Sequence, residues 1–280
     1  MKEGDNNEPL VSICCVTYNH ATFIKTALES FINQKTNFNY EIIINDDAST
    51  DNTTEIIKEY QKKYPEKIIF ISQEVNKFSL GKHPMITYAI PKAKGKYIAL
   101  CEGDDYWTDE NKLQIQVDFL EQNEGFTGCS HQCNKLFPDK SIAIFKPNIK
   151  EILTTKDLIG SRPFHTASFV YRSYITEMHQ IPQQTVSYDK ALFILCSLLG
   201  KIKFFDTVMC VYRINPESIT QNWSIDYLKR DKPVINWLYS INNSFPKYKF
   251  MSNYYKALYS YPKKIKKIKL LGWFMLYLFL

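Results

Sequence analysis

Residues 97–107, YIALCEGDDYW, join an apolar run to a cluster of acidic side chains. The first five residues are apolar enough to form a buried strand, and Glu102, Asp104 and Asp105 follow with one glycine among them. Carboxylates this close together repel one another and cost free energy unless something positive lies among them. Three of them at the end of a buried strand therefore indicate a hard cation with oxygen ligands.

The chain before this stretch alternates between strands and helices. Apolar runs predict four strands, at residues 10–16, 40–44, 67–72 and 96–101. Helical spacing predicts helices between them, at residues 22–33, 49–63 and 82–92, the second opening on capping residues. This order predicts an α/β fold with a Rossmann-like, mostly parallel central sheet and flanking helices. Strands that are apolar throughout fit a sheet covered on both faces.

The chain after this stretch continues in shorter elements. We expect helices at residues 108–123, 154–159 and 188–199. We expect strands within residues 126–145 (two of them), at 168–171, and as two short strands at 202–206 and 208–213. Because no long linker or repeat interrupts this order, residues 1–222 are predicted to form one catalytic domain. A helical, basic C-terminal region follows at residues 223–280.

Polar residues follow three of the predicted strands at the edge where ligands bind in open α/β sheets. They are Thr17, Tyr18 and Asn19 after the first strand, Asp46 and Asp47 after the second, and Glu102, Asp104 and Asp105 after the fourth. Taken alone, the first group is better explained by a loop than by a site, and the second is explained equally well by turn and helix-cap chemistry. Their convergence on one edge favours a common site.

The chemistry of this edge fits a nucleoside diphosphate. Nine glycines are few, and neither G-x-G-x-x-G nor G-x-x-x-x-G-K-[ST] is present, so no glycine-rich loop surrounds a phosphate. A divalent ion held by a few carboxylates keeps positions free for phosphate oxygens, as Mg²⁺ commonly does. We therefore expect a divalent metal, Mn²⁺ or Mg²⁺, to neutralise the diphosphate.

Three segments in this order resemble the GT-A glycosyltransferases of family 2, which are inverting enzymes. They are VSICCVTYNHATFIKTALESFINQ, YEIIINDDASTDNTTEII and AKGKYIALCEGDDYWTDENKLQIQVDFLE, and a later block, YDKALFILCSLLGKIKFFDTVMCVYRIN, resembles the acceptor side of that family. The resemblance covers about residues 10–222, and the order and spacing of the segments make it specific.

The resemblance assigns a role to each polar group. Asp47 matches the aspartate that binds the nucleotide base, with Asp46 beside it and Thr17, Tyr18 and Asn19 near the same pocket. Glu102, Asp104 and Asp105 match the D-x-D cluster, which implies a ribose contact and a metal contact, the latter at Asp105 or Asp104. Arg213 matches an arginine near the diphosphate. Glu102 stands where many relatives have Asp, and Asn215 where many have a metal-binding His, which puts that metal contact in doubt.

Asp189 matches the family's catalytic base. An inverting transfer needs a carboxylate that deprotonates the acceptor hydroxyl opposite the leaving group. The alternative for Asp189 is a structural one, since an acidic residue in the first turn of a helix is favourable to the macrodipole. His165 and Trp107 are predicted to lie on the acceptor side, and a purely structural His165 is the alternative.

The charges are unevenly distributed along the chain. The net charge is +6, but residues 232–280 hold nine lysines and no acidic residue, whereas the first 231 residues hold the other 26 basic residues and all 29 acidic ones. This asymmetry argues against nucleic acid as a partner and for a local electrostatic anchor. Five lysines at residues 263–269 precede LLGWFMLYLFL, a charge-free run too short to span a bilayer.

We therefore expect residues 263–280 to bind an anionic membrane surface, with a helix docked on the body or in a dimer as the alternative. The N-terminal residues, MKEGDNNEPL, are too polar for a signal peptide, so we expect a cytoplasmic protein on the inner face of the cytoplasmic membrane. Seven cysteines in such a protein are expected to be reduced. Cys129, His131 and Cys133 lack the spacing of a common zinc motif, which leaves zinc as a minor alternative.

The sequence thus predicts a metal-dependent inverting glycosyltransferase that moves a hexosyl or hexosaminyl group from a nucleotide sugar. We expect a UDP-linked donor and a hydroxyl acceptor on a surface glycan or lipid-linked oligosaccharide. A nucleotidyltransferase is disfavoured, because that class opens with a glycine-rich basic loop and this chain has TYNHAT there. The rival from another class is a catalytically silent subunit that binds nucleotide sugar or glycan.

Overall fold

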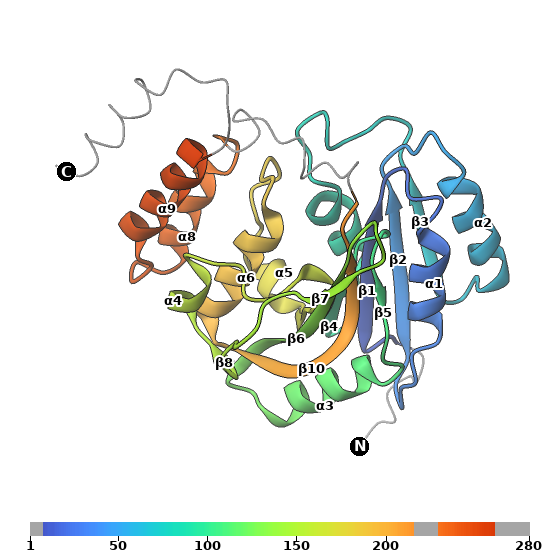
Figure 1. Cartoon of the computed structure of the whole chain (residues 1–280), viewed down its shortest axis with the longest axis horizontal. Helices are drawn as coiled ribbons and strands as arrows, with labels where there is room; N and C mark the ends of the chain where they lie inside the picture. Colours follow the sequence, from blue (N-terminus) through green and yellow to red (C-terminus); the bar gives the residue numbers. More distant parts are fainter. Residues whose placement is uncertain (1–7, 216–228, 261–280) are drawn as a thin grey trace.

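A single mixed sheet organises the molecule (Figure 1). The computed structural model describes residues 8–215 and 229–260 of the chain. Within them the strand order is β3-β2-β1-β4-β9-β6-β10-β5, with β7 paired to β6 and β8 paired to β10. The predicted α/β class and the mostly parallel sheet are confirmed.

The first half of the sheet is parallel and follows the predicted alternation. Its strands are β1 (Val11–Thr17), β2 (Tyr40–Asp46), β3 (Ile68–Ser72) and β4 (Tyr97–Leu100). The helices α1 (Ile24–Ile32) and α2 (Thr53–Lys63) lie together on one side of these strands (Figure 1). The helix predicted at 82–92 is a π turn, η1 (Met85–Ala89), followed by a 3₁₀ turn, η2 (Ile90–Lys92). Pro91 has no N–H to continue a regular helix there.

The second half of the sheet is mixed, because β9 and the short strands β5, β7 and β8 run antiparallel to their partners. Strand β9 (Val170–Arg172) runs antiparallel to β4 and to β6 (Phe126–Leu136), so β6 and its parallel partner β10 (Lys201–Arg213) run in the direction of β4. The short strands are β5 (Tyr106–Trp107), β7 (Ile142–Ile144) and β8 (Ile152–Leu153). The remaining elements are α3 (Lys112–Gln122), α4 (Thr155–Leu158), η3 (Thr166–Ser168), α5 (Tyr174–Met178) and α6 (Tyr188–Leu199).

The prediction of two short strands at 202–206 and 208–213 was wrong. They are one strand, β10, whose register against β6 shifts between Phe205 and Val208. Asp206 and Thr207, at the break between the two predicted strands, lie in this irregularity and form a bulge. The bulged strand stays continuous and delivers Arg213 to the same edge as the acid cluster.

Both faces of the sheet are buried, as the unbroken apolar strands predicted. Alternate residues of each strand enter two separate hydrophobic cores: Ile13 and Ile42 pack on the side of α1 and α3, whereas Cys14 and Ile43 pack on the side of α6. This division follows from the two-residue period of a strand. All seven cysteines are buried and none forms a disulfide.

Two further helices cover α6. They are α8 (Lys232–Ile241) and α9 (Lys247–Ser260), and Val234, Ile235 and Leu238 of α8 share the core with α6. The helical character predicted for the C-terminal region is therefore found in α8 and α9, and α8 is part of the same body. The predicted membrane anchor at 263–280 lies outside the described residues. No helix in the described part of the chain combines the length and hydropathy needed to cross a bilayer.

Candidate active site

The three predicted polar groups meet at the carboxyl edge of the sheet. Thr17 and Asp46 are paired in register at the ends of β1 and β2. The N–H of Asp47 donates to the carbonyl of Thr17 (3.0 Å), and the N–H of Gly103 donates to the carbonyl of Val16 (2.9 Å). The chain therefore brings residues 17, 46–47 and 102–105 side by side, as the order of parallel strands required.

Asp46 and Asp47 make different contacts. The fully buried carboxylate of Asp46 accepts hydrogen bonds from Ser49 and Thr54, so it organises the turn that leads into α2. The carboxylate of Asp47 accepts the N–H groups of Lys77 (2.7 Å) and Phe78 (3.1 Å), and burial raises its pKa. Turn chemistry thus accounts for Asp46, whereas Asp47 faces the loop at residues 73–84.

Thr17, Tyr18 and Asn19 form the turn after β1. Asn19 adopts a left-handed conformation (φ 55°), and its side-chain oxygen accepts the N–H of Thr50 at 2.8 Å. Thr17 is buried, and its hydroxyl makes no hydrogen bond to the described residues. Tyr18 is half-buried. Asn19 therefore ties this turn to the turn after β2.

Gly103 allows the acidic segment to lie against β1. A Cβ atom at this position would come within 2.8 Å of both the Cβ and the hydroxyl of Thr17, and within 3.0 Å of Ile24. Such contacts are closer than side chains tolerate in a packed interior. The glycine in this segment is thus explained by close packing.

Glu102 and Asp105 are each fixed by one carboxylate oxygen. Oε1 of Glu102 accepts the hydroxyl of Tyr188 (3.3 Å), whereas its buried Oε2 has no hydrogen-bond partner in the described structure. Oδ1 of Asp105 accepts the N–H of Arg213 (2.9 Å). Burial, followed by the charge of Asp104, raises the pKa of Glu102 to about 7 and that of Asp105 well above its usual value. The charged form of both carboxyl groups is therefore disfavoured, and the charge of Arg162 offsets this only in part for Glu102.

Asp104 lies on the other side of this segment, toward His20. Its carboxylate is 3.7 Å from Nε2 of His20, and its carbonyl accepts the guanidinium of Arg213 (2.8 Å). The Arg213 guanidinium lies 4.3 Å from the ring of Tyr106, which holds it in place by a cation–π contact. Arg213 thus contacts both Asp104 and Asp105.

His165 lies directly against Asp105 of the acid cluster. Nδ1 of His165 is 3.5 Å from Oδ2 of Asp105, and its ring stacks on Tyr212 with centroids 4.1 Å apart. Burial holds the pKa of His165 well below its usual value, so the imidazole is neutral. Glu102, Asp105 and His165 each offer one ligand atom, and these three atoms lie within 4.8 Å of one another.

Within the described residues, no other group of three or more His, Cys, Asp or Glu side chains lies close enough to share an ion. Cys129, His131 and Cys133, the sequence's minor zinc alternative, are buried along β6 and do not form such a group.

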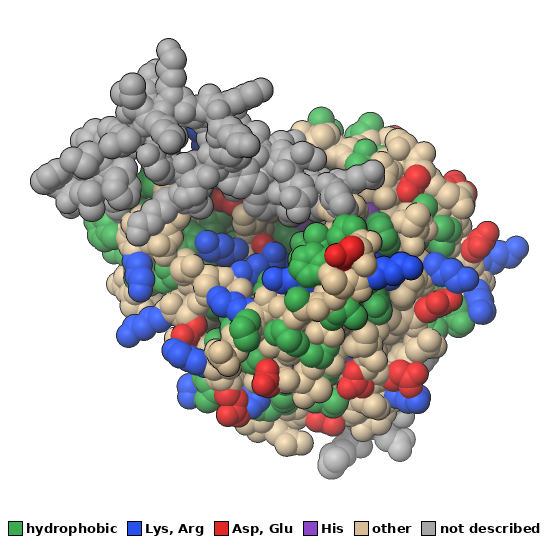
Figure 2. Space-filling model, viewed as in Figure 1, with side chains coloured by type: hydrophobic (Ala, Val, Ile, Leu, Met, Phe, Trp, Pro, Cys, Tyr) green, Lys and Arg blue, Asp and Glu red, His purple; other side chains and the backbone are tan. Residues whose placement is uncertain are grey.

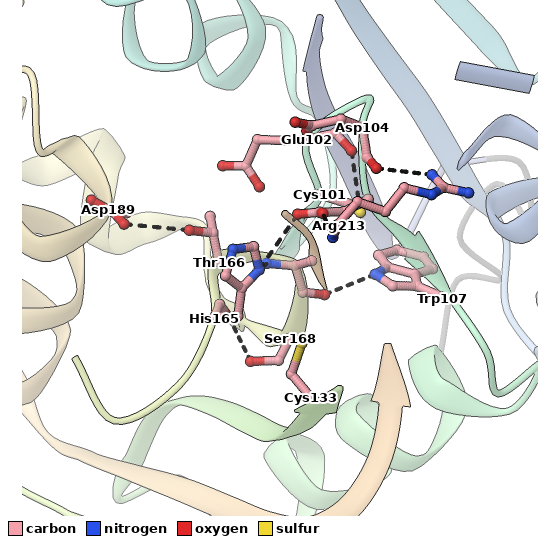
Figure 3. A network of polar contacts seen from close by, with 12 residues as sticks. Cys101, Glu102, Asp104, Trp107, Cys133, His165, Thr166, Ser168, Asp189 and Arg213 are labelled. Carbon is pink, nitrogen blue, oxygen red and sulfur yellow. Dashed lines mark hydrogen bonds and ion pairs between the residues drawn. The ribbon is translucent and has the colours of Figure 1, made fainter. Parts of the chain in front are cut away.

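Trp107 is buried next to the loop that carries His165. It is 4% exposed, and its indole N–H donates to the carbonyl of Ala167 at 2.8 Å (Figure 3). Its ring packs against Phe31 with centroids 4.8 Å apart. In this position Trp107 supports the segment that carries His165 and Thr166, a buried contact that the sequence, which indicated an acceptor-side position for Trp107, did not predict.

Asp189 faces the acid cluster from the first turn of α6. Figure 3 shows Asp189 and Thr166 on one side of the cluster, and Arg213 and Trp107 on the other. The neighbouring residue Tyr188 binds Glu102, which fixes the start of α6 beside the acids. Oδ2 of Asp189 lies 2.7 Å from Nη2 of Arg162 and 3.4 Å from the hydroxyl of Thr166.

Arg162 was missed by the sequence analysis. It lies in a loop, in the stretch SRPFH, where no periodicity or repeated spacing distinguishes it. The same Nη2 atom that contacts Asp189 also lies 2.5 Å from the hydroxyl of Thr166. The only available signal was a basic residue three positions before His165, and that alone indicates little.

The sequence comparisons identify the family. The model of "Glycosyl transferase family 2" matches residues 12–178. This chain belongs to glycosyl transferase family 2. An uncharacterized protein of Mycobacterium bovis is 34% identical over 224 residues, which are 79% of this chain and 63% of that protein. The chain thus spans less than two thirds of the length of that mycobacterial relative.

A second relative has a named activity. The Escherichia coli protein WfaP, a UDP-Glc:alpha-D-GlcNAc-diphosphoundecaprenol beta-1,3-glucosyltransferase, is 38% identical over 122 residues, which are 44% of this chain and 45% of WfaP.

Solved structures of glycosyltransferases share the GT-A fold of this chain. S. aureus TarS (residues 1–349) in complex with UDP-GlcNAc superposes with a TM-score of 0.70 at 16% identity, covering 95% of this chain and 81% of that one. The mannosyltransferase PcManGT from Pyrobaculum calidifontis, in complex with GDP-Man and Mn²⁺, superposes with a TM-score of 0.56 at 15% identity, covering 98% and 81%. At such low sequence identity, the similarity to these two structures shows a shared fold only.

Proposed function

We propose that the chain is a metal-dependent inverting glycosyltransferase, transferring a hexosyl or hexosaminyl group from a UDP-sugar to a hydroxyl of a surface glycan or lipid-linked oligosaccharide. The observation that carries this proposal is the contact between Tyr188 and Glu102, which sets the carboxylate of Asp189 opposite the acid cluster. A general base and a site for a departing diphosphate must face each other across the reacting carbon.

The residues of the acid cluster fit a divalent metal ion. Within the part of the chain that the structure describes, Oε2 of Glu102 is buried without a partner. The raised pKa values of Glu102 and Asp105 indicate carboxyl groups that a cation would stabilise. The candidate ligands are Glu102, Asp105 and Asp104. When bound there, a divalent ion supplies positive charge to the leaving diphosphate. The Mn²⁺ in the PcManGT structure supports the proposal by analogy of fold.

The protein side chains are proposed to bind the donor and to accept the proton of the acceptor hydroxyl. Asp47 is proposed to bind the nucleotide base, beside the turn formed by Thr17, Tyr18 and Asn19. Arg213 is proposed to bind the diphosphate. The acceptor oxygen attacks the anomeric carbon, the bond to the diphosphate oxygen breaks with its electron pair, and Asp189 takes the hydroxyl proton. Attack from the face opposite the leaving group inverts the configuration of that carbon.

The nature of the donor and acceptor is supported by the named relatives. TarS was solved with UDP-GlcNAc, and the name of WfaP specifies UDP-Glc and a diphosphoundecaprenol-linked acceptor. A lipid-linked acceptor also agrees with the proposal that the lysine-rich residues 263–280 contact the inner face of the cytoplasmic membrane. On the face shown in Figure 2, basic and acidic side chains are interspersed over the described surface, which does not resemble a binding face for nucleic acid.

Calorimetric titration with UDP-, GDP- and dTDP-sugars, first with Mn²⁺ and then with EDTA, tests this function. We expect one donor to bind tightly and to lose its affinity when the metal is removed. Failure of every nucleotide to bind with metal present would contradict the proposal. Slow hydrolysis of the bound donor, detected as released nucleoside diphosphate, would exclude the alternative of a catalytically silent binding subunit.

The membrane proposal has its own test. Deletion of residues 263–280 should abolish sedimentation with vesicles that contain anionic lipid. Unchanged sedimentation of the truncated chain would refute it.

A further inference from the structure

The carboxylates of Glu102 and Asp105 each use one oxygen in a hydrogen bond to the protein, and the other oxygen accepts no hydrogen bond from the described residues. In Glu102, Oε1 accepts the Tyr188 hydroxyl and Oε2 is buried without a partner among the described residues. In Asp105, Oδ1 accepts the N–H of Arg213 and Oδ2 faces His165 at 3.5 Å. Hydrogen bonds to the second oxygen of a carboxylate commonly orient it as a metal ligand. Tyr188 and Arg213 thus orient the two carboxylates toward a common point.

The imidazole of His165 is held in a fixed orientation at the same point. Its ring stacks on Tyr212 at an interplanar angle of 21° and meets the edge of Phe145 with centroids 5.6 Å apart. Nδ1 also accepts the N–H of Ala167, at the long distance of 3.3 Å. A cation at Nδ1 would replace this weak bond, and the ring would not have to turn.

The separation of the ligand atoms suits a small octahedral divalent ion. Two ligands at right angles around an ion about 2.1 Å from each lie about 3 Å apart. The distance of 3.5 Å between Nδ1 of His165 and Oδ2 of Asp105 is close to this value, and the third ligand atom, on Glu102, lies within 4.8 Å of both. Small side-chain adjustments therefore complete a three-ligand site.

Asp104 lies outside this group. Its carboxylate points toward His20, at 3.7 Å, and is 15% exposed, whereas that of Asp105 is 1% exposed. The two neighbouring aspartates thus have different surroundings, although the sequence gives no way to tell them apart.

We propose that His165 is the nitrogen ligand of the divalent metal ion, with Glu102 and Asp105 as the oxygen ligands and Asp104 outside the inner set. The proposal rests on the proposed function, because it concerns the same metal. Mg²⁺ is bound mainly through oxygen ligands, whereas first-row transition-metal ions such as Mn²⁺ also take an imidazole nitrogen. The site should therefore prefer Mn²⁺ to Mg²⁺, and this preference should depend on His165.

Pulsed electron paramagnetic resonance of the full chain with Mn²⁺ alone, and then with Mn²⁺ and UDP, tests this assignment. We expect a nitrogen coupling that changes when histidine is labelled with ¹⁵N, since the label identifies an imidazole ligand. The coupling should persist in the His20→Gln and His83→Gln variants, which alter the two other histidines near the site, and disappear in His165→Gln. Titration should show Mn²⁺ affinity lowered about tenfold or more in His165→Gln.

Two results would overturn the proposal: Mn²⁺ bound to the wild type without a histidine coupling, or a coupling that survives in His165→Gln. If His165→Gln does not fold, as judged by its thermal unfolding curve, the ¹⁵N label in the wild type and the two control variants still decide the question. A histidine-coupled Mn²⁺ in a chain that binds no nucleotide would retain the metal site and reject the glycosyltransferase function. The two proposals can therefore fail separately.

Discussion

Nη2 of Arg162 lies 2.7 Å from Oδ2 of Asp189, the carboxylate proposed as general base. The side chain of Arg162 is 40% exposed and that of Asp189 16%, so solvent screens this ion pair and its contribution to stability is small. Its effect is on orientation: Arg162 and Thr166 hold one oxygen of Asp189, and the N–H of Lys190 holds the other at 2.7 Å. The base therefore keeps one position before an acceptor arrives.

Asp189→Asn should abolish transfer while donor binding is kept. The amide preserves the size of the side chain but does not accept the proton of the acceptor hydroxyl, so we expect kcat to fall by about 10²- to 10⁴-fold. The nucleotide affinity measured by calorimetry should stay within about twofold, because Asp189 contacts no group assigned to the nucleotide. A variant that retains full transfer activity would remove Asp189 from the role of base.

Arg162→Gln should lower kcat by less than Asp189→Asn does. The glutamine removes the charge that orients Asp189, and misplacement of a reacting group by about 1 Å costs up to about 10²-fold in rate. Arg162→Lys should fall between wild type and Arg162→Gln, since lysine keeps the charge but loses the planar fork. The measurement is kcat and KM for the acceptor in all three proteins. Equal kcat in wild type and Arg162→Gln would show that Thr166 and the backbone N–H of Lys190 are enough to orient Asp189.

Gly103→Ala should destabilise the chain, because the added Cβ would lie 2.8 Å from Thr17. Overpacking of this kind costs about 1–3 kcal/mol in free energy of unfolding. Gly125→Ala is the matched control, since an added Cβ there would meet nothing within 4 Å. Urea unfolding of both variants measures the difference. If Gly103→Ala were as stable as Gly125→Ala, the acidic segment would have shifted to make room for the added methyl group. A change in metal affinity would then reveal that shift.

The sequence was sufficient to predict the edge of the sheet at which the site lies. Apolar strands without alternation predicted a covered parallel sheet, and the carboxyl ends of such strands share an edge, so Thr17, Asp47 and Glu102 had to be neighbours. The continuity of β10 was missed because the polar residues Asp206 and Thr207 separate two apolar runs.

Individual contacts within the site could not be predicted. Arg162 and His165 lie in a loop whose path depends on tertiary packing, including the hydrogen bond from Trp107 to Ala167. No local pattern indicates that His165 meets Asp105, which is 60 residues earlier in the chain. Likewise, only the structure shows that Asp46 organises a turn while its neighbour Asp47 faces residues 77–78.

Acid should destabilise the protein through His83. This side chain is 8% exposed, its ring lies 4.2 Å from that of Tyr188, and burial lowers its pKa from 6.5 to about 3. Of the charged groups near it, Asp189 raises this pKa and Arg230 lowers it. Below pH 6.5, His83 therefore binds a proton in the unfolded chain, whereas in the folded chain it binds one only near pH 3.

The stability that His83 contributes is thus present above pH 6.5 and is lost as the pH falls toward 3. Between pH 6.5 and 5 the loss amounts to about 2 kcal/mol. Urea unfolding of wild type and His83→Gln across this range isolates the effect, because the variant lacks the titrating group. Parallel pH profiles for the two proteins would show that His83 is protonated in the folded state as readily as in the unfolded state.

Lys112→Met should stabilise the protein at pH 7. The amine of Lys112 is fully buried at the start of α3, lies 4.0 Å above the ring of Trp107 and has no hydrogen-bond partner in the described structure. Burial lowers its pKa to about 8, and a positive charge at a helix N-terminus is unfavourable to the macrodipole. A methionine of similar length removes the unpaired charge at the cost of a cation–π contact worth about 2 kcal/mol, so we expect a net gain of about 1 kcal/mol.

The pH dependence of this gain identifies its cause. The unfolded lysine keeps its proton up to pH 10.5, whereas the folded one loses it at about pH 8, so wild type gains stability as the pH rises between these values. The advantage of Lys112→Met should therefore shrink between pH 7 and 9.5. Lys58→Met, at an exposed position on α2, is the matched control and should change stability by less than about 0.5 kcal/mol. A Lys112→Met variant less stable than wild type at pH 7 would mean that the contact with Trp107 outweighs the cost of burying the charge.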